Sequence, residues 1–174
     1  QLGMSLANCE LKFCGNKIHT EGLRVLYVDC ENGNEEYIRR FHRIKKHMDW
    51  KDNGNWLGIT KTGTTEDIYE TIHEICEKYF KPDLIIIDSL YNSTAEGDLS
   101  KSHPMSRITN QLVAYKEKYD ATILVVHHFN KWGDEFGLSM QRMSGSSVLQ
   151  NWLEWCVLMT KTNIPNFNLW TVGK

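Results

Sequence analysis

Three polar residues stand at the ends of apolar segments of the kind that form buried strands. A strand that is apolar along its length is covered on both faces, as in the parallel sheet of an α/β protein. Because neighbouring parallel strands end at the same edge of a sheet, where ligands bind, we expect these side chains to converge there. The residues are Glu31, Asp88 and His128, and the segments before them are residues 23–30, 84–87 and 121–126.

The types of these three residues suit phosphoryl transfer. Asp88 is suited to hold a magnesium-bound water, because Mg²⁺ retains much of its hydration shell and prefers oxygen ligands. Glu31 is suited to orient or deprotonate the water that attacks a terminal phosphate, since this reaction needs its nucleophile in line. His128 is suited to contact that phosphate as a donor and to report whether it is still attached.

Each residue also has a purely structural interpretation. A single Asp after a strand is often a helix cap or a turn former. Adjacent residues of a strand point to opposite faces, so His127 and His128 would be one core and one exposed residue, and they make a poor metal pair. The convergence of three such groups on one edge favours the functional interpretation.

Composition indicates an ordinary globular protein. The chain has 174 residues, of which 41% are hydrophobic and 24% charged, and we predict a single α/β domain over residues 1–174. A net charge of −2 gives no general excess of Lys and Arg, so any contact with nucleic acid would be local. The five cysteines include no C-x-x-C pair, which favours free thiols in a reducing compartment over a zinc site. With neither a membrane-spanning segment nor a signal peptide visible, we expect a cytoplasmic protein, or an intracellular viral or plasmid-encoded one.

Helical and strand periodicities alternate along the chain. This alternation predicts βαβ units around a mainly parallel sheet, with the last two strands close enough to pair as a hairpin. Residues 129–147 are predicted to form a loop and are the best candidate for a mobile element. The expected helices are residues 2–13, 34–50, 65–79 and 104–119 with a helical turn at 148–155, and the expected strands are 23–30, 56–60, 84–88, 121–126, 156–160 and 168–172.

Four short motifs follow one another in the order found in RecA-like ATPase cores. They are Val25–Asn32, Leu84–Ser89, Ile123–Lys131 and Arg142–Val148. Together they resemble most closely the plasmid RepA-type and phage hexameric replicative helicases, in which a strand ending in His-His precedes a DNA-facing loop and a Gly-Ser-Ser segment. The resemblance spans roughly residues 1–174. It implies a RecA-like three-layer α/β sandwich with a mainly parallel central sheet and a C-terminal β-hairpin.

The resemblance implies a role for each residue at the nucleotide. Glu31 matches the family's catalytic glutamate, and His128 matches the sensor position, which is also counted as catalytic. Asp88 matches the Walker B aspartate that holds Mg²⁺ through water, and Ser89 beside it is expected at the nucleotide. Lys174 resembles a lysine that enters the nucleotide site of the neighbouring subunit, although an ordinary solvated chain end is the alternative.

A DNA-binding loop is implied in the same way. The segment from Lys131 to Arg142 corresponds to the loop that faces DNA in the central channel of such rings. Lys131, Trp132 and Arg142 would contribute phosphate contacts and a stacking surface. The alternative is a solvated loop, because Asp134 and Glu135 oppose phosphate binding.

One motif of the family does not occur in this sequence. G-x-x-x-x-G-K-[ST] cradles phosphates with its backbone N–H groups and pairs them with its Lys. Gln1–Met4 is what would follow such a motif. We therefore expect a domain truncated at both ends, which binds ATP poorly by itself.

The resemblance implies the motor core of an ATP-dependent DNA helicase or a related replication ATPase. Such a protein uses ATP and Mg²⁺, hydrolyses ATP at the subunit interfaces of a ring, expected to be a hexamer, and moves on single-stranded DNA. Two alternatives stay open. One is a non-hydrolysing RecA-like module for assembly or regulation, and the other is a recombinase-type or clock-type ATPase of the same fold.

Overall fold

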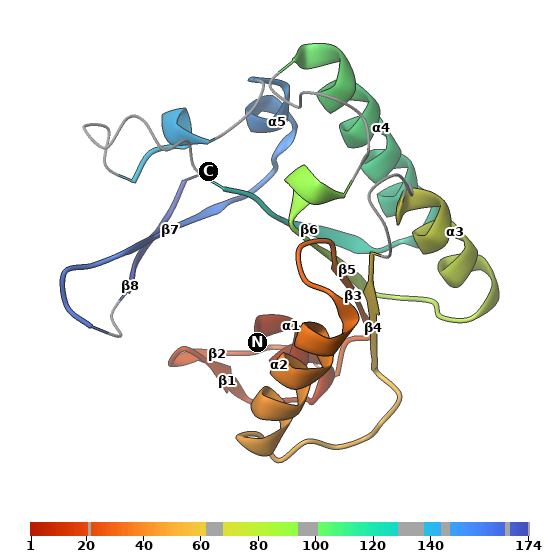
Figure 1. Cartoon of the computed structure of the whole chain (residues 1–174), viewed down its shortest axis with the longest axis vertical. Helices are drawn as coiled ribbons and strands as arrows, with labels where there is room; N and C mark the ends of the chain where they lie inside the picture. Colours follow the sequence, from red (N-terminus) through yellow and green to blue (C-terminus); the bar gives the residue numbers. More distant parts are fainter. Residues whose placement is uncertain are drawn as a thin grey trace. The chain divides into compact units, whose positions relative to one another are not determined.

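The computed structural model describes residues 1–20, 22–61, 68–93, 101–128, 138–143, 147–165 and 168–173. The chain forms two compact units (Figure 1). The first consists of Gln1–Ala95 and Leu112–Val126, and the second of Glu96–Gln111 and His127–Lys174. That these residues act as one domain stays a prediction.

A four-stranded parallel sheet forms the centre of the first unit. Its strands lie in the order β4-β3-β5-β6, and every neighbouring pair is parallel. The middle strands are rich in branched residues because both of their faces are covered, and β5 is buried at its first four positions. The strands are β3 (Val25–Asp29), β4 (Trp56–Thr60), β5 (Leu84–Asp88) and β6 (Thr122–Val126).

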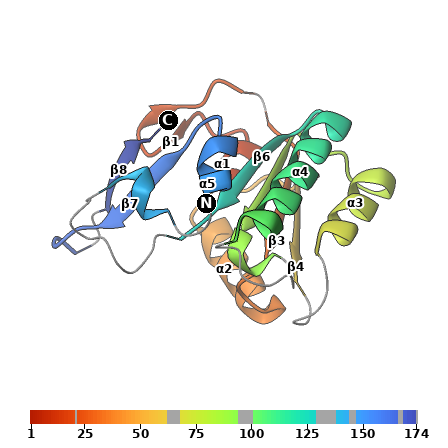
Figure 2. The same cartoon turned by 90° about the horizontal axis from the view of Figure 1, so that it is seen from above.

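Helices cover both faces of this sheet. Figure 1 shows α1 (Leu2–Ala7) and α2 (Asn34–Lys46) on one side, and α3 (Ile68–Lys78) on the other. The second half of α4 (Ser102–Tyr119) lies beside α3, and Figure 2 shows the same two helices together in a second view. The core below α1 and α2 is built from Ala7, Val25, Leu84 and Ile86, with Leu6, Leu23, Tyr27, Trp50, Trp56 and Leu124 packed against it.

Helix α1 packs against the sheet through Gly3. A Cβ atom at Gly3 would be 2.6 Å from the Ile86 side chain and 3.2 Å from the Trp56 ring. A larger residue at this position would have to push the end of the Ile86 side chain aside, so Gly3 favours the close contact between α1 and β5.

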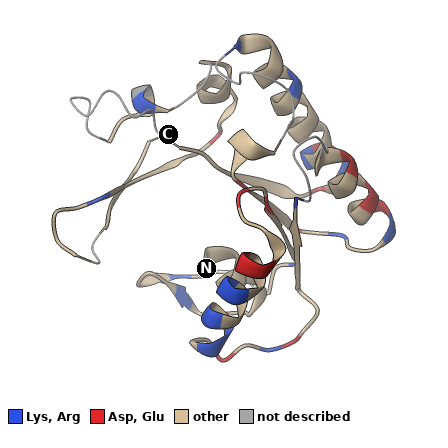
Figure 3. Cartoon of the chain, in the orientation of Figure 1, with Lys and Arg blue, Asp and Glu red and all other residues tan. Residues whose placement is uncertain are grey.

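Helix α2 is an amphipathic surface helix, as predicted. None of its residues is fully buried, and its first turn is acidic while its last turn is basic. Figure 3 shows this change of sign along the helix. The distribution complements the helix dipole, because carboxylates stabilise the N-terminal end and ammonium or guanidinium groups the C-terminal end.

The second unit contains the first half of α4, a short helix α5 (Ser147–Trp152) and a hairpin of two antiparallel strands. The strands are β7 (Val157–Lys161) and β8 (Asn168–Val172). Leu149 and Leu158 are its buried residues on α5 and β7. The side-chain amide of Gln150 donates to the carbonyl of Met140, at a distance of 3.0 Å, and so ties α5 to the 3₁₀ turn Met140–Arg142.

The fold class predicted from the sequence is confirmed: the protein is α/β, with a mainly parallel sheet and a C-terminal hairpin. The predicted helix over residues 2–13 is wrong beyond Ala7. Cys9 has a positive φ angle of 60°, which a helix does not allow, and the last two residues of the predicted helix instead belong to a small hairpin. That hairpin pairs β1 (Lys12–Phe13) with β2 (Asn16–Lys17). Within the described residues no helix has the length and hydrophobicity needed to cross a bilayer.

Candidate active site

Two carboxylates end neighbouring strands at the same edge of the sheet. Asp29 closes β3 and Asp88 closes β5, and the two residues are register partners. The pairing continues one residue further, because the N–H of Cys30 donates to the carbonyl of Asp88 at 2.6 Å. Since alternate residues of a strand share a face, both carboxylates lie on the face that α1 and α2 cover.

The Asp29 side chain is a buried anchor for the segment that carries Glu31. It is 2% exposed. Its Oδ1 accepts hydrogen bonds from the backbone N–H of Glu31 at 3.0 Å and of Asn32 at 2.8 Å, and from the Asn32 side chain at 3.1 Å. This is the local pattern by which an Asp turns the chain at the end of a strand. Glu31 itself is exposed, so the fold holds its backbone and leaves its carboxylate at the surface.

The Asp88 side chain is half-buried and has one oxygen already engaged. The hydroxyl of Tyr27 donates to Asp88 Oδ2 at 2.7 Å. Burial, and then this hydrogen bond, raise the pKa of Tyr27 far above its ordinary value, so the hydroxyl keeps its proton and remains a donor. The other carboxylate oxygen of Asp88, Oδ1, is therefore the one left for a ligand.

The start of α1 lies close to Asp88. Gly3, in the first turn of α1, packs against Ile86, which stands two residues before Asp88 on β5. The first turn of α1 therefore lies next to the last part of β5.

Lys61 is a residue of this edge that the motif analysis missed. It follows β4, and its backbone N–H donates to the carbonyl of Asp29 at 2.9 Å. Its ammonium group donates to the carbonyl of Asn92 at 3.0 Å. Burial raises the pKa of the neighbouring Cys30 to about 12, and the positive charge of Lys61 works against that rise. In the sequence, Lys61 appears only as a lysine directly after a predicted strand, and this pattern is too common to predict a functional residue.

Ser89, which directly follows Asp88, is completely buried. The Asn92 side-chain amide donates to its hydroxyl at 3.4 Å, and its carbonyl accepts from the Asn92 backbone N–H at 3.2 Å. These contacts close the 3₁₀ turn Leu90–Asn92. Direct contact of Ser89 with a nucleotide stays a prediction.

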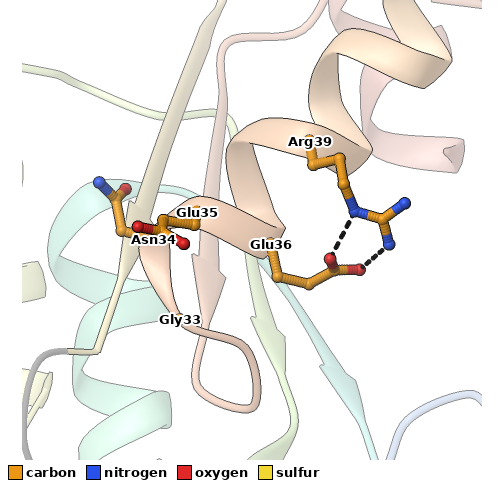
Figure 4. Close-up of a pocket in the computed structure, with 5 residues that line it drawn as sticks. All are labelled: Gly33, Asn34, Glu35, Glu36 and Arg39. Atoms are coloured by element: carbon orange, nitrogen blue, oxygen red, sulfur yellow. Dashed lines mark hydrogen bonds and ion pairs between the residues drawn. The ribbon is translucent and has the colours of Figure 1, made fainter.

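A surface pocket of about 470 Å³ lies at the start of α2, two residues after Glu31. Figure 4 shows Arg39 and Glu36 joined across one turn of the helix on one side of it. Glu36 accepts hydrogen bonds from Arg39 at 2.7 Å and 2.8 Å and from Arg40 at 2.6 Å, and these lower the pKa of this carboxyl to about 2. The pocket is lined by Gly33, Asn34, Glu35, Glu36 and Arg39.

The remaining predicted residues belong to the second unit. His128 follows β6 by two residues and is exposed, and Arg142 is half-buried in the turn Met140–Arg142. The convergence of His128 with Glu31 and Asp88, and the contact of Arg142 with DNA, stay predictions. Lys131, Trp132 and Lys174 lie outside the described residues.

The donor set at Asp88 fits magnesium. The described residues contain no group of three or more His, Cys, Asp or Glu side chains that could enclose a metal ion. Asp88 offers a single carboxylate with one engaged oxygen. Mg²⁺ usually keeps much of its hydration shell and shares its remaining ligands with substrate phosphates, so a single carboxylate suits it. An ion that needs a full set of protein ligands would fit this site less well.

The order of the parallel strands and the two carboxylates at one edge of the sheet are features of an α/β nucleotide-binding core. The family model described as "AAA domain" matches residues 1–134, and the chain belongs to this family. Among solved structures, the crystal structure of the RadB recombinase has a similar fold, with a TM-score of 0.59 and 16% identity over 87% of this chain and 69% of that one. No curated protein sequence matches the chain significantly.

Proposed function

We propose that this chain is the ATP-hydrolysing motor core of a DNA helicase or related replication ATPase. The observation that carries the proposal is the pairing of Asp29 with Asp88 at one edge of the sheet. Through that pairing Asp29 holds the Glu31 segment beside the strand end where Asp88 stands. Phosphoryl transfer needs a metal site and a water-orienting group held side by side, and Asp88 and Glu31 provide both.

In the proposed reaction each residue has a defined task. Asp88 would hold Mg²⁺ through a bound water, with Oδ1 as its available oxygen, and Glu31 orients the attacking water and accepts its proton. Mg²⁺, when bound, neutralises charge on the phosphate oxygens. His128 contacts the terminal phosphate. Ser89, at the end of β5 beside Asp88, binds the nucleotide. Lys174 acts from a neighbouring subunit.

We also propose that the protein assembles into a ring, with six subunits as the expected number, and moves on single-stranded DNA. The support for this is the likeness of the motif order to hexameric replicative helicases. Lys131, Trp132 and Arg142 would contact the strand. Because phosphate contacts release counterions, binding of an oligonucleotide should weaken as salt is raised.

A second candidate function is that of a recombinase-type ATPase. The similarity in fold to a RadB recombinase supports it. The two functions differ in their DNA reaction: a helicase separates a duplex with a single-stranded tail, whereas a recombinase pairs a single strand with a homologous duplex.

The test uses the full-length protein that contains this chain. We expect Mg²⁺-dependent ATP hydrolysis that single-stranded DNA stimulates, together with unwinding of a tailed duplex and a ring-sized particle by light scattering. Strand pairing without unwinding would favour the recombinase. Absence of hydrolysis, with or without DNA, would favour a non-hydrolysing assembly module.

A further inference from the structure

We propose that Tyr27 is a positioning residue for Asp88, which fixes the Asp88 carboxylate so that Oδ1 faces the metal-bound water. This role rests on the proposed function of Asp88. The contact that carries it is the hydrogen bond of 2.7 Å from the Tyr27 hydroxyl to Asp88 Oδ2. A donor on one oxygen removes the freedom of the carboxylate to rotate, as partners behind metal ligands commonly do.

The register of the sheet explains how Tyr27 makes this contact. Tyr27 on β3 pairs with Ile86 on β5, so Asp88 is its diagonal neighbour, two residues further along the adjacent strand. Diagonal neighbours on one face lie within the reach of an aromatic side chain. Among the common side chains, a tyrosine supplies both the length and the terminal hydroxyl that this geometry requires.

The Tyr27 ring is held from two other elements. It stacks on Trp56 of β4, with ring centroids 5.5 Å apart, and on Tyr37 of α2, with centroids 6.1 Å apart. Trp56 in turn donates from its indole N–H to the Tyr37 hydroxyl at 3.1 Å. A ring in contact with two other aromatic rings has little freedom to move its hydroxyl, so the position of the Asp88 carboxylate is set by packing as well as by its own rotamer.

Tyr37 offers a matched control, because it is a tyrosine of the same cluster whose hydroxyl contacts Trp56 and not Asp88. Tyr27→Phe and Tyr37→Phe each remove one hydroxyl and keep the stacked rings. Asp88→Asn serves as the reference for loss of the metal site itself. All variants are compared in the full-length protein after far-UV and near-UV circular dichroism and thermal unfolding have confirmed a native fold.

The measurement is the affinity for Mn²⁺ in the presence of ATP, followed by electron paramagnetic resonance, together with the dependence of kcat on Mg²⁺ concentration. In Tyr27→Phe we expect Mn²⁺ to bind about 10-fold more weakly, in the range typical for lost partners of metal ligands. We expect kcat at low Mg²⁺ to fall and to recover as Mg²⁺ is raised, with KM for ATP close to the wild-type value. Tyr37→Phe should match the wild type in all of these.

The outcomes separate this inference from the proposed function. If Asp88→Asn weakens Mn²⁺ binding and Tyr27→Phe does not, Tyr27 has no positioning role and the proposed function stands. If Tyr27→Phe and Tyr37→Phe lower activity equally without a Mg²⁺ dependence, the hydroxyls only stabilise the aromatic cluster. If Asp88→Asn binds Mn²⁺ as well as the wild type does, the proposed metal site at Asp88 is itself refuted.

Discussion

The carboxylate of Asp29 fixes the backbone of Glu31, two residues further along the chain. Asp29 Oδ1 accepts the backbone N–H of Glu31 at 3.0 Å and lies in the sheet beside Asp88. One buried acid therefore links the strand edge to the exposed glutamate that follows it. The burial of Asp29 is tolerated because its oxygens are hydrogen-bonded, since a buried charge without partners is costly.

We predict that Asp29→Ala destabilises the protein by about 1–3 kcal/mol, because backbone donors at Glu31 and Asn32 lose their buried acceptor. Asp29→Asn keeps an Oδ1 acceptor and should lose less. The free energy of unfolding in urea measures both, with Asp52→Ala, an exposed position, as the control. Equal stability of Asp29→Ala and Asp52→Ala would show that Asp29 does not anchor this segment.

A second prediction concerns the contact between α2 and the edge of the sheet. A Cβ atom at Gly58 on β4 would come within 1.5 Å of the Tyr37 hydroxyl oxygen. Gly58→Ala must therefore displace Tyr37, and we expect a loss of about 1–3 kcal/mol in the free energy of unfolding, as is usual for overpacking.

Gly33→Ala is the control for this prediction, because a Cβ atom there meets no other atom within 4 Å and the φ angle of −71° is ordinary. We expect it to cost less than Gly58→Ala. Near-UV circular dichroism and tryptophan fluorescence should change in Gly58→Ala, since Tyr37 stacks with Tyr27 and is bonded to Trp56. Unchanged spectra would contradict the packing described above.

A third prediction concerns thiol reactivity. Burial raises the pKa of Cys30 to about 12 and that of Cys76 to about 11, whereas Cys9 and Cys14 are exposed. Because the thiolate is the reactive form, iodoacetamide at about pH 8 should modify Cys9 and Cys14 first. Mass spectrometry of timed samples measures the order, and early labelling of Cys30 in folded protein would contradict it.

The raised pKa of Cys30 also makes the free energy of unfolding depend on pH. The folded state keeps the Cys30 proton to a higher pH than the unfolded state does, so its contribution is complete below the ordinary thiol pKa of about 9. It is lost as the pH rises from there towards about 12. Cys30→Ala should reduce the fall in the free energy of unfolding over this range.

The central sheet could be predicted because its strands are unambiguous. The predicted strands at 56–60 and 84–88 have the bounds found in the structure, and the hairpin of β7 and β8 is where it was expected. Short segments rich in branched and aromatic residues and bounded by turn formers leave little choice of structure. The helix predicted over 2–13 failed because periodic apolar residues also fit a short helix followed by a hairpin, and the positive φ angle at Cys9 has no sequence signature.

The candidate site was predictable only in part. Asp88 and Glu31 could be singled out because Asp88 ends an apolar strand and Glu31 follows one by two residues. Tyr27 could not be singled out, because its proposed role depends on a diagonal contact between two strands. The local sequence does not show which strands are neighbours in the sheet. Asp29 was treated as part of the strand, since burial with three hydrogen-bond donors is visible only once the turn is formed.

Steady-state and single-turnover ATP hydrolysis by the full-length protein with Glu31→Gln shows whether Glu31 is the general base. Glu35→Gln is its control, because Glu35 is an exposed acid in the first turn of α2, close to Glu31 in the chain. We predict that Glu31→Gln lowers kcat by at least about 100-fold, as expected for loss of a general base, while ATP still binds. Glu35→Gln should hydrolyse ATP at close to the wild-type rate. Undiminished turnover in Glu31→Gln would contradict the account.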